Sequence, residues 1–199
     1  MATPGEWADE VGKLPGIQRV TAVGSRTNGT ANELSDWDYA VDTVDFAATR
    51  EALTELAREW HPLAAQWDPF PTDGTFMVLL PNAVKVDFIF GAHPAVTRDA
   101  WDPGRDDAQA IEVHFWDWLL WLGSKTLKGD EELVRRELDK MYVLLLRPLG
   151  ASAAPRTLDE AVAEFSRWRG SVNSPAPALV GQEVMAALRR AGVVPGERS

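Results

Sequence analysis

The most informative stretch of this sequence is residues 23–41, which read VGSRTNGTANELSDWDYAV. An apolar run ends at Gly24-Ser25, a polar turn follows, and residues 37–44 are rich in the aromatic and β-branched residues that favour strands. Side chains two residues apart on a strand point to the same face, so we expect Asp36 and Asp38 to lie side by side. The stretch therefore predicts two strands joined by a polar turn, with two carboxylates at the start of the second strand.

A third carboxylate belongs to the strand predicted over residues 84–90, VKVDFIF. Its apolar residues alternate, which forces Asp87 onto the opposite face together with Lys85. If this strand pairs beside the strand that Asp36 and Asp38 open, the three carboxylates converge. Neighbouring carboxylates repel one another unless a divalent cation lies between them, and hard oxygen ligands suit Mg²⁺. The pattern indicates a metal site of the kind that two-metal phosphoryl transfer uses.

Gly24 and Ser25 supply the features that a phosphate site needs. Glycine lets the backbone approach a phosphate closely, and the serine offers a hydroxyl group. If residues 25–31 start a helix, the free N–H groups of its first turn also point at the anion. The whole pattern is Gly-Ser, ten intervening residues, Asp-x-Asp and a later strand aspartate. This combination is far more specific than any of its parts.

The first half of the chain alternates strand-like and helix-like stretches. Residues 17–23 form an apolar run, and residues 47–60 carry apolar side chains at helical spacing. Residues 76–80 and 84–90 flank Pro81-Asn82, which predicts a hairpin. These features favour a small mixed sheet with at least one helix.

After residue 90 the strand signal disappears. Residues 91–110 hold the prolines and glycines typical of a crossover. Further helices are predicted over residues 112–127, 130–149, 158–169 and 182–191. We therefore expect an α+β fold, with a small mixed β-sheet domain over residues 1–92, a linker over 93–110 and an α-helical bundle over 111–199.

Composition and charge exclude several classes of protein. The chain has 199 residues and a formal net charge of −10. Such a surface repels a phosphate backbone, so we expect no nucleic acid partner. The absence of cysteine excludes disulfides and thiolate metal sites, and the three separated histidines disfavour a zinc site. No apolar run reaches the ~20 residues of a membrane span and no secretory leader is recognisable, so we expect no membrane association and a cytoplasmic location.

The combination of Val23-Gly24-Ser25, Asp36-Trp37-Asp38 and Asp87 resembles the signature of the nucleotidyltransferase superfamily of the DNA polymerase beta type. Within it, the chain looks most like the small antibiotic-modifying enzymes of the kanamycin and lincosamide nucleotidyltransferase kind. Those enzymes add a helical domain after the catalytic sheet, so the helical half resembles them in architecture only. One departure is the run from Arg26 to Gly29, Arg-Thr-Asn-Gly, which stands where the family commonly has Ala-Arg-Gly.

The resemblance implies an enzyme that depends on Mg²⁺ or Mn²⁺ and transfers NMP from an NTP, with ATP expected, to an acceptor hydroxyl group. By this resemblance Asp36 and Asp38 would hold the cation, and Gly24 and Ser25 would bind the triphosphate. Asp87 would complete the metal site or act as general base on the acceptor.

The helical half offers further candidate residues. Trp121 and Lys125 lie on one face of the helix predicted over residues 112–127. Lys125 would either reach the nucleotide phosphates or be an ordinary cation near the end of a helix, where positive charge is favoured. In some family members the general base is a carboxylate of the helical domain, for which Glu112 and Asp117 are the first candidates here.

The resemblance points to a small hydroxylated acceptor, aminoglycoside-like or lincosamide-like, and the negative charge of the chain favours a cationic or neutral molecule. Two other functions stay open. One is a minimal-type enzyme of the same fold that AMPylates a protein. The other is a catalytically silent nucleotide-binding module. The identities of the NTP and of the acceptor, and the choice between a monomer and a homodimer, are open as well.

Overall fold

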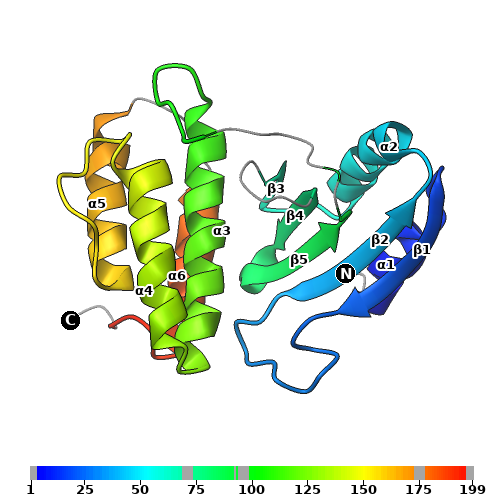
Figure 1. Cartoon of the computed structure of the whole chain (residues 1–199), viewed down its shortest axis with the longest axis horizontal. Helices are drawn as coiled ribbons and strands as arrows, with labels where there is room; N and C mark the ends of the chain where they lie inside the picture. The colour runs from blue at the N-terminus through cyan, green and yellow to red at the C-terminus, as the bar shows by residue number, and fades with distance from the viewer. Residues whose placement is uncertain (1–3, 69–73, 92, 94–98, 173–177, 196–199) are drawn as a thin grey trace. The chain divides into compact units, whose positions relative to one another are not determined.

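The structure is a computed structural model that describes residues 4–68, 74–91, 93, 99–172 and 178–195 of the chain. It confirms the predicted α+β fold, which combines a five-stranded mixed sheet with a group of helices (Figure 1). The contacts divide the chain into two compact parts, which we call the sheet unit (residues 1–31 and 35–97) and the helical unit (residues 32–34 and 98–199). None of the helices in the described ranges combines the length and the apolar character needed to cross a membrane.

The sheet unit contains the strands and two helices. Its elements in chain order are α1 (Pro4–Val11), β1 (Ile17–Val23), β2 (Trp37–Thr43), α2 (Phe46–Glu59), β3 (Ala64–Trp67), β4 (Thr75–Leu80) and β5 (Val84–Ile89). The strands lie in the order β1-β2-β5-β4-β3, in which β2 and β5 are parallel and the other neighbours antiparallel. β4 and β5 form the predicted hairpin, joined by a 3₁₀ turn over Pro81–Ala83.

The core of the sheet unit lies between one face of the sheet and the two helices. Tyr39 of β2 and Phe88 of β5 are buried there, with ring centroids 5.6 Å apart. Val11 of α1 and Leu53 of α2 are fully buried in the same cluster. This burial fixes the strand register, because a slip of one residue would exchange the two faces of a strand. The intervening residues of β2 and β5 are thereby held on the opposite face.

The helical unit is built around α3. Its elements are α3 (Ala108–Leu127), α4 (Glu131–Met141), a π-helical turn (Tyr142–Leu146), α5 (Leu158–Ser171) and α6 (Ala178–Arg190). α3 contacts α4, α5 and α6, and Phe115 of α3 stacks on Phe165 of α5 with ring centroids 3.9 Å apart. The side chain of Asp107 accepts a hydrogen bond from the N–H of Gln109, so α3 begins earlier than the apolar spacing predicts.

The boundaries between the units lie at residues 31–32, 34–35 and 97–98. Residues 32–34 belong to the helical unit although they connect β1 to β2. Asn32 Nδ2 donates to the carbonyl oxygen of Ser124 at 2.8 Å, and Ser124 Oγ donates to Asn32 Oδ1 at 3.2 Å. The chain therefore passes between the units at three places, and the sequence pattern gave no sign of the first two.

Candidate metal and nucleotide site

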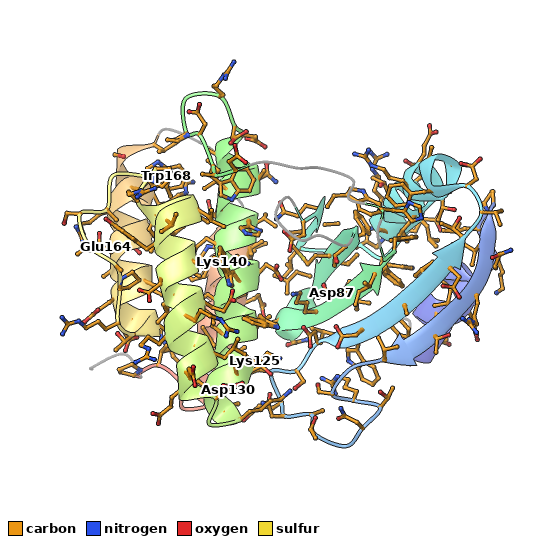
Figure 2. All side chains as sticks on the ribbon, viewed as in Figure 1. Asp87, Lys125, Asp130, Lys140, Glu164 and Trp168 are labelled. Carbon is orange, nitrogen blue, oxygen red and sulfur yellow. The ribbon has the colours of Figure 1, made fainter. Side chains whose placement is uncertain are left out.

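Three carboxylates converge on the face of the sheet opposite α1 and α2. Asp38 of β2 and Asp87 of β5 are direct partners in the parallel register, and Asp36 directly precedes β2. One carboxylate oxygen of each residue lies within 4.8 Å of those of the other two. The structure thus brings together the three residues that the sequence pattern placed on one face. Figure 2 shows Asp87 on β5.

Lys85 places a positive charge in this cluster. Its Nζ atom lies 3.0 Å from Asp87 Oδ2 and 4.0 Å from Asp36 Oδ2, and its side chain is only 8% exposed. Lys85 is a residue of the candidate site that sequence reasoning did not select. The signal was present, because the alternation that turns Asp87 away from the core also turns Lys85, two positions earlier, onto the same face.

The donor set of the cluster fits a hard divalent cation. All three candidate ligand atoms are carboxylate oxygens, and the ammonium group of Lys85 balances only part of their charge. In a Mg²⁺ shell with bonds of about 2.1 Å, neighbouring oxygens lie roughly 3 Å apart and opposite oxygens roughly 4.2 Å apart. One oxygen of each carboxylate lies within 4.8 Å of those of the other two, so the three side chains would draw closer to share one cation. Asp36, Asp38 and Asp87 are therefore the residues that would hold a cation.

Gly24 is required by the position of Asp38. The backbone of Gly24 has a φ of +74°, and a Cβ atom added there would lie 2.0 Å from Asp38 Oδ2. An L side chain is therefore disfavoured by the left-handed conformation and by the carboxylate in its way. Sequence reasoning assigned this glycine to close approach of a phosphate. The structure adds that the space beside it is taken by a candidate metal ligand.

The Ser25 hydroxyl lies next to this turn. Its Oγ atom is buried, and among the described residues no group forms a hydrogen bond with it. A buried hydroxyl without a partner costs free energy, so such a group is a candidate for contact with a bound ligand. Ser25 therefore fits a role as a donor to a phosphate oxygen.

The helix considered for residues 25–31 does not form. These residues are all described, and they make turns and irregular structure. Asn28 Oδ1 accepts hydrogen bonds from the backbone N–H and the hydroxyl group of Thr30, and Gly29 adopts a φ of +76°. These local bonds compete with helix formation. An anion here would meet turn N–H groups and the Ser25 hydroxyl rather than the start of a helix.

Arg26 is held against the other end of the same loop. Its Nε atom donates to the carbonyl oxygens of Asp36 at 3.0 Å and Ser35 at 3.2 Å, and Nη2 also donates to that of Ser35. The guanidinium group lies over the ring of Trp37, with Cζ 4.2 Å from the ring centroid. Burial lowers the pKa of Arg26, and the neighbouring carboxylates of Asp36 and Asp38 oppose that shift. Sequence reasoning recorded Arg26 only as a departure from the family pattern.

The remaining sequence candidates lie in the helical unit, and the carboxylate cluster is complete without them. Lys125 Nζ lies 4.8 Å from the centroid of the Trp121 ring, a cation–π contact that accounts for its position without a phosphate (Figure 2). Glu112 accepts a hydrogen bond from Arg169 Nε at 2.8 Å, and its side chain is 7% exposed. This carboxylate already forms a buried ion pair, which makes it a poor candidate for a general base. Asp117 is buried on α3.

Comparison with known proteins adds no assignment to these observations. No model of a known protein family matches the sequence, and no curated protein matches it. The functional argument therefore rests on the site itself.

Proposed function

We propose that this protein is a Mg²⁺-dependent nucleotidyltransferase. The observation that carries the proposal is the convergence of Asp36, Asp38 and Asp87 beside the Gly24-Ser25 turn. Carboxylate ligands of this kind are typical of sites that bind Mg²⁺ together with substrate phosphates. The Ser25 hydroxyl, which is buried and makes no hydrogen bond to the described residues, follows Gly24 directly and would donate to a phosphate oxygen.

In the proposed reaction, the oxygen of an acceptor hydroxyl group forms a bond to the α-phosphorus of an NTP. The bond from that phosphorus to the bridging oxygen breaks, and pyrophosphate leaves. A bound cation supplies positive charge that offsets the charge developing on the phosphate oxygens. The chain positions the two substrates, which is the other large contribution to phosphoryl transfer.

Each residue of the site then has a separate task. Asp36 and Asp38 would hold the cation, and the Ser25 hydroxyl would donate to a phosphate oxygen. Asp87 would complete the cation site or accept the proton of the acceptor hydroxyl group. Lys85, at 3.0 Å from Asp87, orients that carboxylate and offsets the repulsion among the three acids.

The charge of the chain bears on the acceptor. A protein with a formal net charge of −10 attracts cations and repels polyanions. We therefore propose a small hydroxylated acceptor that is cationic or neutral, such as an amine-bearing sugar. We further propose that the donor is ATP, which would bind together with Mg²⁺ that offsets part of its negative charge, and that the reaction takes place in the cytoplasm.

One observation favours a second candidate function. The ion pair with Lys85 occupies an oxygen of Asp87, the carboxylate that we propose as the base if it does not hold the cation. A site in which this carboxylate is unable to act as a base would bind Mg²⁺ and nucleotide without transfer. The second candidate is thus a catalytically silent nucleotide-binding module.

A pyrophosphate-release screen separates these functions. Four NTPs are tested with Mg²⁺ against a panel of hydroxylated small molecules, with and without amino groups, and Mg²⁺-dependent NTP binding is measured in parallel by calorimetry. The transferase predicts release with at least one acceptor, whereas the silent module predicts binding without release.

The variant Asp38→Asn tests the site assignment, with Asp42→Asn as its matched control. Asp42 lies on the same face of β2 but is paired with Arg19 at the surface. We expect Asp38→Asn to lose the coupling between metal and nucleotide binding and Asp42→Asn to retain it. If Asp38→Asn binds Mg·NTP as well as the wild type does, the assignment is wrong.

A further inference from the structure

Strand pairing fixes the backbone of Asp38 but not that of Asp36, the other aspartate of the Asp-x-Asp motif. Asp38 is paired on both sides, with Val23 of β1 and Asp87 of β5. Asp36 precedes β2, and the pairing of β2 with β5 begins only at Trp37. The backbone of Asp36 therefore needs another anchor if its carboxylate is to stay near that of Asp38, because the two negative charges repel each other.

Arg26 supplies such an anchor. Its guanidinium group donates hydrogen bonds to the carbonyl oxygens of Ser35 and Asp36 and stacks on Trp37, the residue between the two aspartates. A planar guanidinium can make this pair of bonds and the ring contact together, whereas the single ammonium group of a lysine cannot reproduce that geometry. These contacts connect the Gly24-Ser25 turn to the point where β2 begins.

The charge of Arg26 acts on the same residues. Asp36 and Asp38 stabilise the protonated guanidinium, so the guanidinium in turn stabilises the two carboxylates. Arg26 thus fixes the backbone that carries the carboxylates and offsets part of their repulsion. The carbonyl oxygens of Ser35 and Asp36 accept these hydrogen bonds from Arg26.

We propose that Arg26 is a positioning residue of the metal site, which holds Asp36 in register with Asp38 so that one cation can bind both. The inference rests on the proposed function, since it takes these carboxylates as metal ligands. It differs from a role as a phosphate ligand, because in that case Arg26 would contribute to nucleotide binding even without a metal ion.

The test compares nucleotide binding with and without metal. Binding of a non-hydrolysable ATP analogue to the full chain is measured by calorimetry in EDTA and in Mn²⁺, and Mn²⁺ binding alone is followed by electron paramagnetic resonance. The variants are Arg26→Ala, Arg26→Lys and the control Arg19→Ala, which removes an exposed arginine paired with Asp42 at the far end of β2. Thermal unfolding of each variant gives its melting temperature, and binding is measured well below that temperature so that each variant is folded.

We expect Arg26→Ala to weaken Mn²⁺ binding and its coupling to the nucleotide by about 10- to 100-fold, the usual effect of losing a residue that orients metal ligands. Nucleotide binding in EDTA stays unchanged. Arg26→Lys restores only part of the loss, and Arg19→Ala behaves as the wild type. If Arg26→Ala does not fold, Arg26→Lys alone carries the test, and full wild-type coupling in that variant overturns the inference.

Two other results overturn the inference, and a third concerns the proposed function. Wild-type coupling in a folded Arg26→Ala variant removes the positioning role. An equal loss of nucleotide binding in EDTA and in Mn²⁺ assigns Arg26 to the phosphates instead. If the wild-type chain itself binds neither Mn²⁺ nor the analogue, the proposed function fails, and the inference that rests on it falls with it.

Discussion

The ion pair of Lys85 allows a quantitative prediction about stability. At 3.0 Å from Asp87 Oδ2 and with an effective dielectric constant of about 20, the ammonium group contributes roughly 5 kcal/mol of attraction. Desolvation offsets part of this attraction, and removing one partner of a buried pair typically costs about 3–5 kcal/mol. We expect Lys85→Met, which keeps the length and the apolar stem of the side chain, to lower the free energy of unfolding by about 3 kcal/mol when divalent cations are absent.

The assay is urea unfolding in EDTA, with the exposed Lys13→Met as the control. A double-mutant cycle with Asp87→Asn measures the pair, because the double variant leaves one negative charge fewer in the cluster than Lys85→Met and should be more stable than that single variant. Added Mg²⁺ should stabilise Lys85→Met more than the wild type, since it binds the folded site, which has become more negative. A Lys85→Met variant within about 0.5 kcal/mol of the wild type, the range of ordinary surface changes, would refute this reasoning.

Three further predictions concern residues of the sheet unit. Gly24→Ala should lower the free energy of unfolding by about 1–2 kcal/mol because of its left-handed backbone, and calorimetry should show weaker Mg·NTP binding because the new methyl group displaces the Asp38 carboxylate. Asp87→Asn should lower turnover by at least ~10²-fold, as for a general base, while the control Asp42→Asn keeps wild-type turnover. Near-normal turnover in Asp87→Asn would show that Asp87 is not the general base. Burial raises the pKa of Tyr39, so the folded state resists its ionisation, and the stability that Tyr39 contributes is full below about pH 10 and lost at higher pH. Tyr39→Phe should flatten that alkaline decline in pH-dependent unfolding, and an unchanged slope would exclude this cause.

The sequence predicted those parts of the site that follow from strand alternation. The apolar residues around Asp87 determine which face it occupies, and the same rule applies to Asp38, whereas Asp36 lies one residue before β2. The pairing of β2 with β5, which makes Asp38 and Asp87 neighbours, was assumed in the sequence analysis and was not itself predicted. Pairing between distant strands depends on how the whole sheet packs, and a local pattern does not contain it.

The position of Arg26, which sequence reasoning missed as a residue of the site, depends on closure of the loop between β1 and β2. Arg26 meets Ser35 and Asp36 only because the chain folds back over ten residues. The same closure uses side-chain bonds of Asn28 where a helix was considered, and spacing alone does not distinguish these outcomes. Lys85 could have been found, since an alternating strand places its charged residues on one face as reliably as its apolar ones.

The loop that leads into Asp36 contains residues of both units. Here Asn32 is bonded to Ser124 of α3, and residues 32–34 belong to the helical unit. Ser35 comes directly after these residues in the chain, and its carbonyl oxygen accepts hydrogen bonds from Arg26 of the sheet unit. The few residues that lead into Asp36 are therefore bonded to the helical unit at one end and to the sheet unit at the other.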